Sequence, residues 1–182
     1  MKTLKQNQKG MTLIELIIVV ALIGIIGATL VPTFSNMTTK ARITSDISTL
    51  KTFQRQVDVF EAEFGRLPGC LATTVASAET VKVENAITDL VSNNYMDTKY
   101  ISGTTLGTPT QGTTQAKGGD YKLQLQTATD GSPTTVVYNP TTKLFQLQSV
   151  PVKYIKAIKD DASALAWIDA SEVSNALGTS EK

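Results

Sequence analysis

The sequence of 182 residues contains no histidine and a single cysteine, Cys70. Without histidine, the chain lacks the side chain that most often serves as an acid–base catalyst near neutral pH and as a metal ligand. A lone cysteine cannot form an intramolecular disulfide, so we expect Cys70 to behave as a small, partly buried apolar residue. The sequence also contains no nucleophile elbow, phosphate-binding loop or dinucleotide-binding fingerprint. We therefore expect a protein that is not an enzyme.

Aromatic and charged residues are also few. Aromatics make up 6% of the chain, with Trp167 the sole tryptophan, and charged residues make up 18%. The hydrophobic share of 41% is ordinary for a globular protein, so we expect a small aliphatic core rather than wholesale disorder. The formal net charge of +1 provides no overall attraction to nucleic acid or acidic lipid.

One long apolar run lies near the amino terminus. Residues 16–31 carry no charge, and the next charged residue is Lys40. As an α-helix, residues 11–31 would be about 31 Å long, enough to cross the core of a bilayer. A buried helix, a secretory signal peptide and a membrane anchor are the three interpretations. The run is unusually long for a soluble domain and no small-x-small cleavage site follows it, which favours the membrane anchor.

An acidic residue, Glu15, interrupts this run near its start. A carboxylate at the centre of a bilayer costs roughly 2.5–3.5 kcal/mol or more. Glu15 could simply complement the positive end of the helix, which is worth roughly 0.3–1 kcal/mol. Alternatively it could pair with a cation, and a cut after Gly10 would create one in the α-amino group of Met11. The second interpretation explains the basic leader, Gly10 and Glu15 together.

Residues 9–16 read KGMTLIEL and resemble the class III signal of type IV prepilins and type II secretion pseudopilins. The family pattern is glycine, a hydrophobic residue that is commonly phenylalanine, then Thr-Leu-x-Glu and an apolar stretch. Met11 takes the place of the phenylalanine here. The resemblance implies that a prepilin peptidase cuts between Gly10 and Met11 and that Met11 is then N-methylated. It also implies that Glu15 pairs with the Met11 amine of an adjacent subunit during assembly.

The resemblance further implies a structural subunit of a type IV pilus or type II secretion-like filament. Its partners would be identical or related pilin subunits, the prepilin peptidase and methylase, and an inner-membrane assembly platform. Residues 1–10 would be the leader peptide, residues 11–32 the transmembrane and assembly helix, and residues 33–182 an extracytoplasmic head that includes the second half of the long helix. Lysines before the span favour a cytoplasmic amino terminus, so the subunit would cross the cell membrane once before it joins an extracytoplasmic or surface filament.

Small residues and a proline lie within the apolar run. Gly24 and Ala28 form a small-xxx-small pair, which lets helices approach closely in lipid. Pro32 is expected to kink the helix or to open its hydrogen-bond ladder locally. The resemblance suggests that the stretch near such residues extends or melts inside a filament. Gly24 and Pro32 are therefore candidate assembly residues alongside Glu15.

The helical pattern continues beyond the proline. Apolar residues recur every three, four or seven positions over residues 43–64, which predicts one long helix over residues 11–64 whose second half packs on a head. Gly65 is the expected C-cap, and Pro68 prevents continuation. Residues 64–69, FGRLPG, resemble the turn that follows the long helix in major pseudopilins.

The remainder of the chain predicts a small α+β head. Three antiparallel strands packed on the long helix would bury its apolar stripe, which matches the pilin fold that the resemblance implies. The expected elements are a second helix, a surface loop, three strands and a short helix, at residues 78–95, 102–119, 121–125, 135–138, 144–150 and 162–167.

Two alternatives concern the carboxy-terminal part. Major pseudopilins often hold calcium there, and Asp160 and Asp161 raise that possibility, but no recognisable ligand spacing occurs and we expect no metal or cofactor. A competence (DNA-uptake) pilin with a DNA-contacting head would share the same amino-terminal signal, whereas a plain single-pass anchor would leave that signal a coincidence. We expect a solvated face and no nucleic-acid partner from the local basic cluster, which comprises Lys143, Lys153, Lys156 and Lys159.

Overall fold

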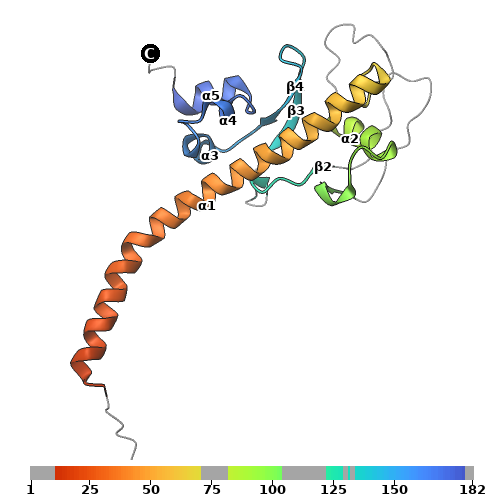
Figure 1. Cartoon of the computed structure of the whole chain (residues 1–182). Coiled ribbons are helices and arrows are strands. Elements are labelled where there is room, and N and C mark those ends of the chain that lie inside the picture. Colours follow the sequence, from red (N-terminus) through yellow and green to blue (C-terminus); the bar gives the residue numbers. More distant parts are fainter. Residues whose placement is uncertain (1–10, 71–81, 104–121, 129–130, 132–133, 179–182) are drawn as a thin grey trace, which may run out of the picture. The chain divides into compact units, whose positions relative to one another are not determined.

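The structure is a computed structural model, and it divides into two units, residues 1–38 and residues 39–182. Helix α1, Leu13–Phe64, supplies residues to both units (Figure 1). The predicted leader and Gly10, and nearly all of the predicted loop at 102–119, lie outside the described residues. The structure describes residues 11–70, 82–103, 122–128, 131 and 134–178.

The part of α1 in the first unit leaves its apolar side chains uncovered. Every large apolar side chain from Leu13 to Met37 is between 47% and 78% exposed. The most apolar stretch of 18 residues in α1 has a mean hydropathy of 2.8, and none of its residues is buried. Within the described ranges, α1 is the one helix that is long and apolar enough to cross a membrane.

Helix α1 continues through Pro32. Because proline has no N–H, the carbonyl of Ala28, four residues earlier, loses its helical donor. Nearby hydroxyls bond back to the helix: the Thr33 hydroxyl donates to the Thr29 carbonyl at 3.3 Å, and the Thr29 hydroxyl donates to the Ile26 carbonyl at 3.0 Å. The long helix predicted across this proline is thus confirmed.

In the second unit, one face of α1 lines the core of the head. Its buried side chains recur every three or four residues, as the sequence predicts for a helix with one buried face. Phe64, at the end of the stripe, is 43% exposed and stacks on Phe60 with ring centroids 4.4 Å apart. The buried stripe, which we call the α1 stripe, comprises Ile43, Ile47, Leu50, Phe53, Val57 and Phe60.

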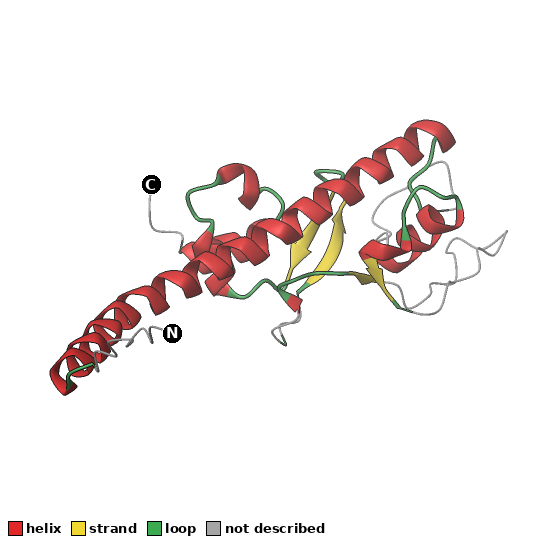
Figure 2. Cartoon of the chain, turned by 60° about the horizontal axis from the view of Figure 1, so that its bottom comes forward, coloured by secondary structure: helices red, strands yellow, loops and turns green. Residues whose placement is uncertain are grey.

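The described residues of the head form two antiparallel strand pairs. Strand β1 (Ile101–Ser102) pairs with β2 (Lys122–Leu123), and β3 (Thr135–Asn139) pairs with β4 (Leu144–Gln148), as Figure 2 shows. The α+β class, with a long amino-terminal helix and small antiparallel sheets, is confirmed. The expected single sheet of three strands is wrong, because the strand predicted at residues 121–125 pairs with β1 rather than joining the other two.

Short helices complete the head. Helix α2 (Val83–Ser92) lies within the second helix predicted from the sequence, and α4 (Ala162–Leu165) within the predicted short helix. Helices α3 (Val152–Ala157) and α5 (Ala170–Leu177) were not predicted. The segment between α4 and α5 pairs with β4, since the Leu147 N–H donates to the Trp167 carbonyl at 2.8 Å.

Two buried polar side chains of α1 hold the head to the helix. Asp46 has no exposed surface. Its carboxylate accepts hydrogen bonds from the Gln126 N–H at 2.6 Å, the Thr127 N–H at 2.9 Å and the Thr127 hydroxyl at 2.6 Å. Gln54 accepts from the Phe145 N–H at 3.0 Å and thereby ties β4 to the same helix. Both polar residues sit beside the α1 stripe, where sequence periodicity gave no sign of them.

We expect Asp46→Ala to destabilise the head by about 3 kcal/mol or more, because it leaves two buried backbone N–H groups and one hydroxyl without their charged acceptor. Urea denaturation of the full chain in mild detergent, followed by the fluorescence of Trp167, measures this. The exposed acid Glu61, on the same helix, is the matched control: Glu61→Ala should change the free energy of unfolding by less than about 0.5 kcal/mol. Equal effects of the two substitutions would contradict the role assigned to Asp46.

Candidate functional site

Helix α1 begins with a reciprocal cap made by Thr12 and Glu15. The Glu15 carboxylate accepts from the Thr12 N–H at 2.8 Å and from the Thr12 hydroxyl at 3.0 Å, and the Glu15 N–H donates to the Thr12 hydroxyl oxygen at 3.4 Å. This arrangement is a capping box, which satisfies donors that the first helical turn leaves open. Sequence reasoning missed Thr12, although the Thr-x-x-Glu spacing before an apolar run is a signal for it.

The predicted cleavage position lies immediately before this cap. Met11 is 68% exposed, and Gly10 lies outside the described residues. In the uncut chain the Met11 nitrogen belongs to a peptide bond, so the amine that Glu15 is predicted to bind exists only after cleavage. Cleavage, N-methylation and the ion pair therefore stay predictions.

The other two residues predicted to act in assembly, Gly24 and Pro32, are exposed in the part of the chain that the structure describes. A Cβ atom added at Gly24, or at the nearby Gly27, would meet nothing within 4 Å. Around Pro32 the apolar surface continues, since Val31 is 70% and Phe34 69% exposed. Gly24 and Pro32 thus lie on an apolar helix surface that is open to partners outside the chain.

The turn that follows α1 is held by an ion pair with α2. The Arg66 guanidinium lies 2.6 Å from the Asp89 carboxylate and 4.9 Å from the centroid of the Phe60 ring. Asp89 is buried, and it also accepts from the Gly69 N–H at 2.8 Å. Gly65 has φ +65°, as expected of a residue just past the end of a helix. The FGRLPG segment is therefore a structural clamp between α1 and α2.

Comparison with protein families identifies the amino-terminal segment. Residues 5–31 match the prokaryotic N-terminal methylation motif. The matched residues include Gly10, Met11, the Thr12–Glu15 capping box and the first part of α1.

Curated relatives extend this match into the head. The chain is 31% identical to the type IV major pilin protein PilE1 of Neisseria gonorrhoeae over 106 residues, which cover 53% of this chain and 59% of that pilin. It is 50% identical over 48 residues to a fimbrial protein of Pseudomonas aeruginosa, covering 25% of this chain and 31% of that protein. The chain is thus similar to type IV pilin and fimbrial proteins.

A third relative has a name that refers to processing. The pilin-like chain is 35% identical over 64 residues to the prepilin peptidase-dependent protein D of Escherichia coli K12, covering 35% of this chain and 44% of that protein. In all three comparisons the chain spans less than two thirds of the relative's length. No solved structure matches the chain.

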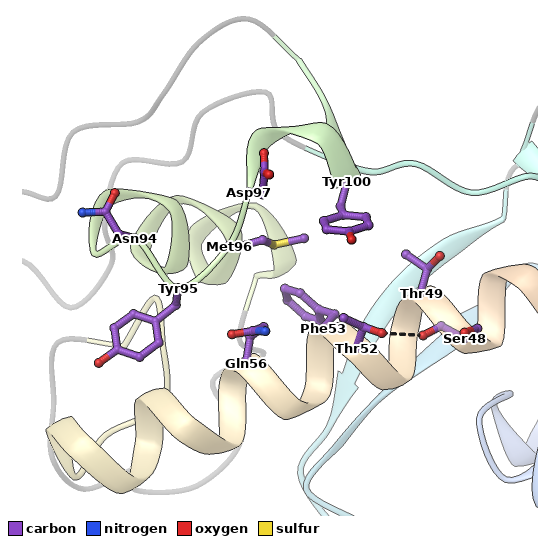
Figure 3. Close-up of a pocket in the computed structure, with 10 residues that line it drawn as sticks. All are labelled: Ser48, Thr49, Thr52, Phe53, Gln56, Asn94, Tyr95, Met96, Asp97 and Tyr100. Carbon is purple, nitrogen blue, oxygen red and sulfur yellow. Dashed lines mark hydrogen bonds between the residues drawn. The ribbon is translucent and has the colours of Figure 1, made fainter.

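The pilin-like head also has an open groove between α1 and the segment that follows α2 (Figure 3). Its volume is about 630 Å³, and both aromatic and hydroxyl- or amide-bearing side chains line it. Phe53 and Met96 lie between its two walls, and the Tyr95 hydroxyl donates to the Glu63 carboxylate. This hydrogen bond raises the pKa of Tyr95, with smaller contributions from desolvation and from the charge of Glu63.

One of the two carboxy-terminal aspartates caps a short helix of the head. Asp161 caps α4, because its carboxylate accepts from the Ser163 hydroxyl at 2.7 Å and the Ala164 N–H at 3.0 Å. These hydrogen bonds lower the pKa of Asp161, and Asp160 is exposed. Among the described residues, no group of three or more histidine, cysteine or acidic side chains is placed to hold a metal ion. The four lysines of the basic cluster, Lys143, Lys153, Lys156 and Lys159, are all exposed.

Two glycines of the clamp offer a matched pair of substitutions. Gly65 and Gly69 both have positive φ, but a Cβ at Gly65 meets nothing within 4 Å, whereas one at Gly69 lies 2.7 Å from the Ala86 nitrogen. We expect Gly65→Ala to cost about 1 kcal/mol through backbone strain and Gly69→Ala to cost about 3 kcal/mol, because the clash with α2 adds to the strain. Urea denaturation of the full chain in detergent measures both. Equal costs would show that Gly69 is not packed against α2 as described.

Proposed function

We propose that this chain is a structural subunit of a type IV pilus or type II secretion-like filament, processed by a prepilin peptidase and polymerised through its amino-terminal helix. The observation that carries the proposal is the methylation motif at residues 5–31, which includes the first part of α1. The most apolar stretch of 18 residues in this helix has no buried residue. The relatives are pilin and fimbrial proteins, which supports a structural rather than an enzymatic role.

In the proposed maturation, the peptidase cuts between Gly10 and Met11 and the new amine of Met11 is methylated. The leader carries Lys2, Lys5 and Lys9, and lysines before a span favour retention of that end in the cytoplasm. The subunit would then cross the cell membrane once, with its head outside the cytoplasm, until an inner-membrane assembly platform adds it to an extracytoplasmic or surface filament.

The capping box gives Glu15 two successive roles in this scheme. Before assembly, Thr12 supplies two hydrogen-bond donors to the Glu15 carboxylate, which lowers the cost of holding that group in an apolar layer. In the filament, the methylated amine of Met11 on an adjacent subunit would supply a cation instead. The donors of Thr12 are neutral, whereas the amine would add the Coulomb attraction of a full opposite charge, so the exchange would favour the assembled state.

The remainder of the amino-terminal helix would provide the packing surface between subunits. In lipid, helices associate through close contact at small residues rather than through the hydrophobic effect. Gly24 and Gly27 have open space around their missing side chains, which suits such contact. Pro32 leaves one helical carbonyl without its donor, so the helix around it would be the easiest part to extend within a filament.

A competence pilin that takes up DNA is the alternative function. It would use the same amino-terminal signal and the same assembly helix. The observation in its favour is the exposed basic cluster of Lys143, Lys153, Lys156 and Lys159, because phosphate contacts supply most non-specific affinity for DNA. The formal charge of the whole chain is only +1, so the chain as a whole has no strong electrostatic attraction to DNA. We therefore favour the filament subunit without DNA contact.

Intact mass and amino-terminal sequencing of the mature protein from its own cells test the maturation. We expect a chain that starts at Met11 and carries one added methyl group. Gly10→Leu should remain uncut, because a large side chain would occupy the cleavage position, whereas Gln8→Leu should be cut normally. A wild-type chain that starts at Met1 would leave a plain membrane anchor, and a cut beyond Val31 would indicate conventional secretion.

Substitution of Glu15 tests the proposed ion pair. We expect Glu15→Ala to insert into the membrane normally but to reduce the filament fraction about tenfold or more, equivalent to about 1.4 kcal/mol or more of lost assembly free energy. Thr12→Ala is the matched control, since it removes the capping hydroxyl and keeps the carboxylate. Sedimentation of sheared filaments against membrane-bound subunit measures both variants. Normal filaments from Glu15→Ala, or an equal defect in Thr12→Ala, would argue against the ion pair.

A further inference from the structure

The outer edges of β2 and β3 have no strand partner among the described residues. Strand β3 pairs with β4 only, and β2 pairs with β1 only. The far edge of β4 is occupied, because it forms a parallel bridge with Ile168. An unpaired edge presents a row of N–H and C=O groups that can accept another strand.

The register shows which groups of β3 point outward. Leu147 of β4 directs its N–H and its C=O to Trp167 and Asp169, at 2.8 and 2.9 Å, and so away from β3. Val136 lies directly opposite Leu147. Facing residues of an antiparallel pair either exchange both hydrogen bonds or point both groups away from each other. The backbone N–H and C=O of Val136 therefore point to the open edge of β3.

The same reasoning applies to β2. The Gln124 N–H donates to the Tyr100 carbonyl at 3.1 Å, so these two residues form a hydrogen-bonded pair. The next pair along, Ile101 and Leu123, must then be a non-hydrogen-bonded pair. The N–H and C=O of Leu123 consequently point away from β1, to the open edge of β2.

One groove lies along both edges. It has a volume of about 690 Å³, and its lining includes Leu123 and Leu125 from the β2 side and Thr134 and Val136 from the β3 side. Thr134 is 6% exposed, and its buried hydroxyl has no hydrogen-bond partner among the residues that the structure describes. A buried hydroxyl without a partner is costly and uncommon in folded proteins. The groove thus combines unpaired backbone groups with a side chain that lacks its partner.

We propose that this groove binds an extended peptide segment of another polypeptide, which adds a strand between β2 and β3. Backbone groups of Leu123 and Val136 would bond to the two edges of the added strand, and the Thr134 hydroxyl would bond to one of its peptide groups. When a peptide adds a strand to a sheet edge, main-chain hydrogen bonds provide the affinity, and pockets for every second side chain of the peptide provide the specificity.

The charges of the lining define the peptide. Its charged side chains are Lys122 on β2 and Glu84 on α2, and the other lining groups are neutral. The complementary segment has an uncharged centre with apolar residues at alternate positions, an acidic residue to face Lys122 and a basic residue to face Glu84. This assignment concerns the head alone and does not depend on filament assembly.

Amide hydrogen exchange of the full chain in mild detergent tests the site. The probe is the blocked peptide acetyl-Glu-Thr-Val-Thr-Val-Thr-Lys-amide at about 1 mM, a concentration that detects weak binding. We expect the amides of Leu123 and Val136 to exchange rapidly in the free chain and about tenfold more slowly with the probe. The amide of Val137, which faces β4, should not change. Unchanged exchange at Leu123 and Val136 would overturn the proposal, as would protection of both amides in the free chain.

Two variants separate binding from folding. Val136→Pro removes the outward N–H without removing a bond to β4, and proline is tolerated at such edge positions, so we expect a folded chain that binds the probe about tenfold more weakly. Val136→Thr, its control, should bind normally. Thr134→Val should raise the unfolding midpoint of the free chain and weaken probe binding, because it removes a hydroxyl that only the added strand satisfies. A lower midpoint with unchanged binding would overturn the role of Thr134.

Discussion

Burial of the α1 stripe is the interaction on which the head depends. The stripe provides buried side chains over about five helical turns, and Phe53 meets Phe145 of β4 edge-to-face with ring centroids 4.9 Å apart. Each fully buried side chain of this size contributes about 1.5–3 kcal/mol, whereas strand pairs as short as β1 and β2 are not stable by themselves. The sheets therefore exist because they cover the helix. Hydrophobic burial does not by itself determine which segment packs where on the helix. The Asp46 carboxylate fixes the position of one segment, because it accepts hydrogen bonds from the N–H groups of Gln126 and Thr127.

Elements with strong local signals were predictable from the sequence. Helix α1 ends at Phe64 because Gly65 adopts a positive φ and Pro68 cannot continue a helix, and both signals are local. Strands β3 and β4 lie where strands were predicted, at residues 135–138 and 144–150, and in the turn between them the Asn139 carboxamide oxygen accepts from the Thr141 N–H at 3.0 Å. In each of these places the neighbouring residues in the sequence were sufficient to predict the element.

The misses share a physical cause, which is dependence on distant contacts. Strand β1 has two residues and is defined by its partner β2, so no local pattern reveals it. Helix α5 was missed, and its fixed position depends on Glu172, whose carboxylate accepts from the N–H groups of Ser149 and Val150, more than 20 residues earlier in the chain. Buried Asp46 was missed for the same reason, since its partners lie 80 residues or more along the chain.

The amino-terminal site shows how one residue can satisfy two interpretations. From the sequence, the roles of Glu15 as a helix cap and as an ion-pair partner compete, but in the proposed maturation they would follow one another. The cap needs only the neutral donors of Thr12, which the chain carries from synthesis. The ion pair needs an amine that only cleavage after Gly10 would create. A carboxylate with a neutral partner is tolerated in an apolar layer yet can still gain from a cation, so cleavage would convert a stable membrane subunit into one that gains free energy by meeting a neighbour.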